Sequence, residues 1–186
     1  MRILIADDES IIRLGLKALL QGLGHEVVTA VDGRDALRQA ERRRPDLAIL
    51  DIKMPFTDGL QVAHTLSRRR PLPIILLTAY SQTELIDKAT DLPIHAYLVK
   101  PVREADLAAA IAVAGKRFAE AQALAARAEE LAGSLAERKL IERAKGRLMA
   151  EGMSEADAYR AMQQAARRRR ESLRAVAEAI LGGEEA

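Results

Sequence analysis

Short apolar runs that end in polar residues recur along the first hundred residues, and stretches of helical spacing separate them. The clearest run is Leu47-Ala-Ile-Leu-Asp51, in which four apolar residues are followed at once by an acid. A continuous apolar run is typical of a strand buried on both faces of a parallel sheet. The pattern predicts strands at 3–6, 25–30, 47–51, 73–78 and 96–100, and helices at 11–20, 35–43, 59–69, 83–90 and from 103 onward.

Strands that alternate with helices at intervals of about 25 residues indicate βαβ units with right-handed crossovers. The expected fold class is therefore α/β, a five-stranded doubly wound parallel sheet. The carboxyl ends of parallel strands lie along one edge of such a sheet, and ligands bind there.

Polar residues follow four of the five predicted strands: Asp7 and Asp8, Asp51, Thr78, and Lys100. Each of them alone is typical of a solvated strand end, but their combination predicts one pocket. Carboxylates that share a pocket repel each other unless a cation lies among them, and oxygen ligands without His or Cys favour Mg²⁺. A carboxylate can also act as a nucleophile toward a phosphoryl group, while a lysine neutralises the charge that develops on its oxygens.

Composition narrows the possible functions. Of 186 residues, 49% are apolar, which is enough for a globular core, and the absence of Cys excludes disulfides and thiolate chemistry. We find no signal peptide and no apolar run near 18 residues, so we expect a soluble, cytoplasmic protein with no membrane partner. The net charge is only +2, but residues 138–174 hold 11 basic and 5 acidic residues, so the basic excess is regional.

The first part of the chain, over residues 1–120, resembles the receiver domain of two-component response regulators. The motifs that carry the resemblance are Asp7-Asp8, Asp51, Met54-Pro55, Asp58-Gly59, Thr78-Ala79 and Tyr97-Leu-Val-Lys100-Pro101. The resemblance implies a flavodoxin-like fold, Asp51 as phosphoacceptor for a histidine kinase, and Mg²⁺ held by Asp7, Asp8, Asp51 and the Lys53 carbonyl. It also implies Thr78 as switch hydroxyl, Tyr97 as switch aromatic and a cis bond before Pro101. His95 stands where the family often has Gly, and we expect His64 and His95 to be surface or packing residues.

After Pro101 the composition changes to an Ala-rich stretch without Pro, which predicts one long helix over residues 104–135. Apolar residues at Leu107, Ile111, Ala114, Phe118 and Ala121 are spaced 4, 3, 4 and 3 apart, as in a heptad seam. Leu124, Ala128, Leu131 and Leu135 continue the seam after a three-residue stammer. We therefore expect a coiled-coil homodimer. The alternative is a helix that folds back on its own receiver.

Three helical segments are expected after residue 135, beginning with 138–149, and they form a small all-α domain. The second opens at Ser154-Glu-Ala-Asp157 with a Ser cap and early acids. The expected core is thin, and consists of Ile141, Leu148, Met149, Tyr159, Met162, Leu173, Val176 and Ile180.

Basic residues of this domain indicate a phosphate-binding surface: Arg138 and Lys145 share a helix face, and Arg167 and Arg168 lie in a basic cluster at a helix end. Cations at a helix end also complement its dipole, which is the structural alternative. Over residues 130–183 the chain resembles the ANTAR domain, through Arg138, Ile141, Ala144-Lys-Gly146, Leu148-Met149, Ser154, Ala158-Tyr159, Leu173 and Val176-Ala177. The resemblance implies that dimers bind paired stem-loops in nascent transcripts and cause transcription antitermination.

The sequence thus predicts a regulator that is phosphorylated on Asp51 and binds RNA as a dimer. It is not an enzyme beyond Mg-dependent self-phosphorylation from a donor and slow self-dephosphorylation. One alternative is a DNA-binding response regulator with a helix-turn-helix, which the acids in residues 154–157 disfavour because they would face phosphates. Another is a relay that passes the phosphoryl group onward without a nucleic-acid target.

Overall fold

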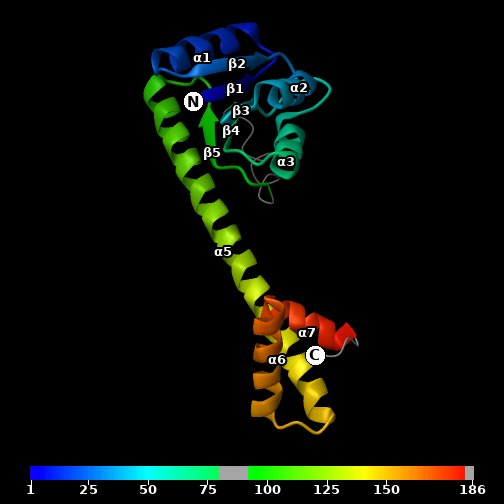
Figure 1. Ribbon diagram of the computed structural model, residues 1–186. Coiled ribbons are helices and arrows are strands. Elements are labelled where there is room, and N and C mark those ends of the chain that lie inside the picture. The colour runs from blue at the N-terminus through cyan, green and yellow to red at the C-terminus, as the bar shows by residue number, and fades with distance from the viewer. Residues whose placement is uncertain (80–91, 183–186) are drawn as a thin grey trace. The chain divides into compact units, whose positions relative to one another are not determined.

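The computed structural model describes residues 1–79 and 92–182, and Figure 1 shows the arrangement of its elements. The chain divides into two compact units, Met1–Gln122 and Ala123–Ala186. The strands are β1 (Arg2–Ala6), β2 (Glu26–Ala30), β3 (Leu47–Asp51), β4 (Ile74–Thr78) and β5 (Ala96–Val99). The helices are α1 (Ser10–Gly22), α2 (Gly33–Arg43), α3 (Gly59–Arg69), α5 (Glu104–Ala150), α6 (Glu155–Arg169) and α7 (Leu173–Gly182).

The first unit is a parallel sheet in the order β2-β1-β3-β4-β5, with α1 and the start of α5 on one face and α2 and α3 on the other (Figure 1). Successive side chains of a strand point to opposite faces, so Ile3 and Ile5 pack toward α1, whereas Leu4 and Ala6 pack toward α2. Both faces are covered, which explains the continuous apolar runs. The predicted α/β fold is confirmed, and the helix predicted at 83–90 lies outside the described residues.

The start of α3 is held against the end of β3. The Asp58 side chain caps α3 by accepting a hydrogen bond from the Gln61 amide (2.7 Å), and the Gly59 amide donates to the Ile52 carbonyl (3.0 Å). A Cβ on Gly59 would lie 2.1 Å from the Asp51 carbonyl oxygen. Glycine is therefore required here by close packing against the backbone that carries Asp51.

Helix α5 is longer than the sequence predicts. It runs without interruption through residues 104–150, whereas we expected one helix to end near 135 and another to occupy 138–149. The prediction was wrong because nothing interrupts the helix between the two segments: residues 135–138 are Leu, Ala, Glu and Arg, which are all good helix formers. The break comes instead at Gly152, whose φ of 103° is left-handed.

The first turns of α5 belong to the core of the receiver. Leu107, Ala110, Ile111 and Ala114 are buried with α1 and the sheet. Leu107 and Ile111 are therefore not available to a dimer seam, which corrects the prediction for these two positions. The heptad spacing was misread because a helix that packs on a sheet also buries every third or fourth residue.

In the second unit, the end of α5 packs with α6 and α7. The buried residues are Ala144, Leu148, Ala158, Met162, Ala165, Val176, Ala177 and Ile180, and four of these eight are alanines. The predicted core residues Met149 and Tyr159 are instead 44% and 40% exposed. Each of them follows a buried residue directly, and a helical turn of about 100° per residue points it away from the core.

No helix among residues 1–79 and 92–182 combines the length and the apolar character that crossing a bilayer requires.

His95 is a packing residue, as expected, while His64 is exposed. The imidazole of His95 accepts a hydrogen bond at Nδ1 from the Ile74 amide (3.1 Å) and meets the Phe118 ring edge-on, with centroids 5.4 Å apart. The Arg117 guanidinium donates to the His95 carbonyl (3.1 Å). Because Nδ1 is an acceptor, His95 is neutral in the folded chain, and it links the start of β5 to the fourth turn of α5.

We predict that this contact weakens in mild acid. Burial lowers the pKa of His95 below its ordinary value of 6.5, so the unfolded chain binds the proton at a higher pH than the folded chain. Stability therefore rises with pH between the lowered pKa and 6.5, and is lost as the pH falls through that window. Amide hydrogen exchange of β4 in the full chain, corrected for intrinsic rates, should show this loss. His95→Asn should remove it and His64→Asn should not; an equal effect of both would contradict the assignment.

We also predict that Gly59→Ala lowers the free energy of unfolding by about 1–3 kcal/mol, because the new methyl group overlaps the Asp51 carbonyl. Gly15→Ala is the matched control, since no atom lies within 4 Å of its added Cβ. It should stabilise the chain by about 1 kcal/mol, because alanine is the better helix former. Urea unfolding followed by circular dichroism measures both, and equal stabilities for the two variants would refute the close contact.

Candidate functional site

Three carboxylates meet at the carboxyl edge of the sheet. Asp7 follows β1 directly, Asp8 is next to it, and Asp51 is the last residue of β3. Residues Ala6 and Leu50 are paired in the parallel register, so the acids that follow them lie side by side. One oxygen of each of the three carboxylates lies within 4.8 Å of the others. Asp7 and Asp51 are buried, whereas Asp8 is exposed.

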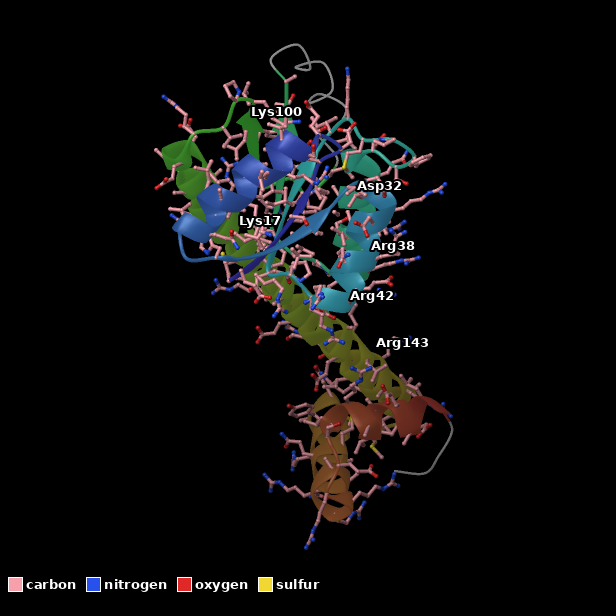
Figure 2. All side chains as sticks on the ribbon, turned by 90° about the horizontal axis from the view of Figure 1, so that it is seen from above. Lys17, Asp32, Arg38, Arg42, Lys100 and Arg143 are labelled. Carbon is pink, nitrogen blue, oxygen red and sulfur yellow. The ribbon has the colours of Figure 1, made fainter. Side chains whose placement is uncertain are left out.

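Lys100 directly follows β5, where Figure 2 labels it, and its ammonium joins this cluster. Its ammonium lies 2.8 Å from Asp7 Oδ2, 3.0 Å from Asp51 Oδ1 and 3.7 Å from Glu9 Oε1. Burial lowers the pKa of Lys100, but the carboxylates of Asp7 and Asp51 raise it by more, so the pKa lies above its ordinary value. The lysine is therefore a fixed positive charge between two buried acids.

The acids still carry more negative charge than Lys100 neutralises. Burial raises the pKa of Asp51 above its ordinary value, and Asp7 and Asp8 raise it further, although Lys100 opposes them. Asp7 Oδ2 is buried, and no group in the described part of the chain meets hydrogen-bond geometry with it, despite the short ion pair with Lys100. Three clustered carboxylates whose charge exceeds that of one lysine suit a hard divalent cation such as Mg²⁺. The residues present fit such an ion.

The backbone around the cluster places the other predicted residues. Lys53 lines the same surface depression as Asp8, Pro55 and Asp58. The buried Thr78 ends β4 next to β3, and its hydroxyl donates to the Ala79 carbonyl (3.0 Å). The Lys100 amide donates to the Thr78 carbonyl (2.9 Å), which ties the two strand ends together.

The two remaining switch positions lie on and after β5. Tyr97 is partly exposed in the middle of the strand. The peptide bond between Lys100 and Pro101 is cis, as the resemblance implied.

Arg13 is a residue of this site that the sequence did not point to. Its guanidinium donates from α1 to the carbonyls of Asp7 (2.7 Å) and Asp8 (3.0 Å). The Glu9 amide also donates to Asp7 Oδ1 (2.8 Å). Both contacts fix the loop that carries the acidic pair. A basic residue within two turns after Asp7-Asp8 was the available clue, but sequence spacing alone does not show which carbonyls it reaches.

The predicted basic residues of the second unit divide into two groups. Arg138, Arg167 and Arg168 are exposed and have no ion-pair partner among the residues the structure describes. Lys145 is buried instead, with its ammonium 2.7 Å from Glu155 Oε1 and 3.2 Å from Glu142 Oε2. Its placement as an exposed phosphate contact is therefore corrected. Arg143, labelled in Figure 2, is a further exposed cation on α5.

Comparison with known families gives two matches. The response regulator receiver domain matches residues 3–112, and the ANTAR domain matches residues 129–181. The chain is a response regulator with a receiver domain and an ANTAR domain.

Relatives of this response regulator include the transcriptional regulatory protein PdtaR of Mycobacterium tuberculosis, 45% identical over 182 residues, which are 97% of this chain and 89% of PdtaR. The probable transcriptional regulator ycf27 of Galdieria sulphuraria is 43% identical over 112 residues, which are 59% of this chain and 43% of ycf27. The second match thus covers a little more than half of this chain.

Solved structures resemble the receiver unit. A response regulator receiver domain protein from Clostridium thermocellum is 34% identical with a TM-score of 0.59, over 62% of this chain and 94% of that one. The receiver domain of the sensor histidine kinase PA1611 from Pseudomonas aeruginosa, solved with a magnesium ion in its active-site cleft, is 30% identical with a TM-score of 0.56. That match covers 61% of this chain and 97% of that one.

Proposed function

We propose that this response regulator takes a phosphoryl group from a histidine kinase onto Asp51 and, as a dimer, binds stem-loop RNA to cause transcription antitermination. The observation that carries the proposal is the Lys100 ammonium between the buried carboxylates of Asp7 and Asp51. The ANTAR match, and a relative named as a transcriptional regulatory protein over nearly the whole chain, support the output.

In the proposed reaction, an Oδ atom of Asp51 attacks the phosphorus of the donor. The new bond forms as the bond from phosphorus to the leaving group breaks, and the leaving group departs with its electron pair. Lys100 stabilises the negative charge that develops on the phosphoryl oxygens. Asp7, Asp8, Asp51 and the Lys53 carbonyl would hold Mg²⁺, which supplies further charge neutralisation when bound. The magnesium ion in the active-site cleft of the PA1611 receiver supports the choice of this metal.

The conformational response would begin at Thr78 and Tyr97. The Thr78 hydroxyl exchanges its bond to the Ala79 carbonyl for one to a phosphoryl oxygen, and Tyr97 changes its position on β5. Moving a switch from 1:99 to 99:1 takes about 5.5 kcal/mol of differential binding. A phosphoryl group adds only one to three charge-assisted hydrogen bonds, so dimerisation has to contribute as well.

Without Leu107 and Ile111, the proposed dimer seam consists of residues of α5 in the second unit. Leu124, Ala128, Leu131 and Leu135 repeat at heptad spacing along α5. Leu124 and Leu131 are 71% and 67% exposed in the single chain. Large apolar side chains at this spacing on an exposed helix face favour a second copy of α5 as their partner.

RNA rather than DNA is the proposed target. Exposed Arg138, Arg167 and Arg168 supply the positive charge that attracts phosphates. The first turn of α6 carries Glu155 and Asp157, which would repel the DNA backbone if this helix entered a groove by its amino end. A relay without a nucleic-acid target leaves the basic excess of the second unit unexplained.

We predict that Asp51→Asn abolishes phosphorylation by acetyl phosphate, because the amide is a poor nucleophile and cannot hold the cation. Intact-mass spectrometry measures the incorporation. Asp106→Asn is the matched control, since this partly exposed carboxylate pairs only with Arg103 in the described structure, and it should leave the phosphorylation unchanged. Phosphorylation of the Asp51→Asn chain would refute the assignment.

We further predict that the chain treated with beryllofluoride, a phosphoryl mimic, binds a double stem-loop RNA obtained by selection in vitro more tightly than duplex DNA of equal length. Leu124→Glu combined with Leu131→Glu should abolish the dimer in light scattering and weaken the RNA binding, because two charges per chain would face each other in the seam.

The control for the seam is Ala126→Glu, which adds a charge to an exposed position of α5 on the side opposite the seam. It should keep both the dimer and the RNA binding. Preference for the DNA duplex, or full RNA binding by the monomeric double variant, would contradict the proposed output.

A further inference from the structure

Lys145 has an environment unlike that of the other cations predicted to bind RNA. It is only 8% exposed, although it lies on α5 in a unit whose surface is rich in arginine. Its Nζ atom donates to Glu155 Oε1 (2.7 Å) and to both carboxylate oxygens of Glu142 (3.2 Å each). The aromatic face of Tyr159 lies below it, with the ring centroid 5.9 Å from Nζ. The ammonium is therefore covered by groups of its own chain, although the side chains of Glu142 and Glu155 themselves face solvent.

The surroundings of Lys145 are unfavourable for a phosphate. A depression of about 710 Å³ opens beside it, and the carboxylates of Glu137, Glu142 and Glu155 line that depression together with one further cation, Arg138. A phosphate that approached Lys145 would have to displace a carboxylate at hydrogen-bond distance and would meet the repulsion of the others. A phosphate contact at this lysine is thus disfavoured both by the bonds it already makes and by the charge around it.

The contacts of Lys145 connect two helices. Glu142 lies on α5 with Lys145, whereas Glu155 is the first residue of α6. The Ser154 side chain caps the same end of α6 by accepting a hydrogen bond from the Asp157 amide (3.2 Å). Farther along, α6 is held by the buried Ala158 and Met162. Lys145 is therefore the polar tie at the amino end of α6, in addition to its apolar packing.

We infer that Lys145, with Glu142 and Glu155, is a clamp that positions α6 on α5 and so determines where Arg167 and Arg168 meet the RNA. The effect of the clamp on RNA binding rests on the proposed function, whereas the clamp itself does not. α6 has 15 residues, and at 1.5 Å per residue it is about 22 Å long. A tilt of about 10° at the clamped end would move the basic end by about 4 Å, which is enough to lose a phosphate contact.

The salt dependence of RNA binding separates a clamp from a phosphate contact. Each lysine or arginine that neutralises a phosphate contributes to the slope of log K against log salt concentration. With the selected double stem-loop RNA, Arg167→Met should lower the magnitude of that slope by about 1 for each protomer, and so by about 2 for the proposed dimer. Lys145→Met should weaken binding several-fold at fixed salt and leave the slope unchanged. A slope lowered as in Arg167→Met would overturn the inference.

Glu155→Gln gives a second test, in which the two hypotheses predict opposite signs. If Lys145 acts as a clamp, removing the charge of its partner weakens RNA binding, as Lys145→Met does. If Lys145 contacts phosphate, removing a nearby carboxylate strengthens the binding. Glu151→Gln is the control, because Glu151 is exposed and pairs with Arg147 (3.7 Å) rather than Lys145. Stronger binding by Glu155→Gln would overturn the inference.

A measurement without RNA keeps the clamp distinct from the proposed function. Amide hydrogen exchange of the full chain should show faster exchange over residues 155–158 in both Lys145→Met and Glu155→Gln, and no change in Glu151→Gln. Circular dichroism checks that each variant keeps its helices. Unchanged exchange at these residues would refute the clamp, whereas failure of the unaltered chain to bind any RNA would refute only the proposed function.

Discussion

The ion pairs of Lys100 with Asp7 and Asp51 depend on strands from separate parts of the chain ending at one edge of the sheet. Burying the carboxylates of Asp7 and Asp51 is unfavourable unless they are paired, so the edge is stable only while β1, β3 and β5 keep their parallel register. The contacts around the edge serve that register: Arg13 holds the acidic loop, and Gly59 lets α3 approach the backbone of Asp51. The contacts that hold the strand ends of the receiver unit in register thus also place the charged groups of its site.

Helix α5 combines two kinds of packing within one uninterrupted element. Its first turns supply Leu107 and Ala114 to the core of the receiver unit, and its last turns supply Ala144 and Leu148 to the core of the second. Between them lies an Ala-rich segment whose residues are exposed in the single chain. A helix with this composition is continuous because alanine favours it at every position, even where no tertiary contact supports it.

The partly buried Lys100 and the buried Lys145 show how the same side chain can differ in function. Lys100 and Lys145 each lie between two carboxylates, but the partners of Lys100 come from strand ends, beside a third acid and an accessible edge. The partners of Lys145 come from two packed helices, and their carboxylates accept the hydrogen bonds that its ammonium donates. A lysine whose surroundings leave room for an anion can act on one, whereas a lysine enclosed by carboxylates holds parts of its own chain together.

The sequence by itself determined the sheet, the order of its strands along the chain, and the acids and lysine at its edge. Buried parallel strands need continuous apolar runs, and a polar residue that follows such a run lies at the carboxyl edge of the sheet. Only the tertiary structure decided which apolar positions of α5 face the receiver, because packing on a sheet and packing in a coiled coil both use spacings of three and four. It also decided that Lys145 is enclosed and Arg138 is exposed. Burial of a charge depends on partners such as Glu155, which the local pattern does not show.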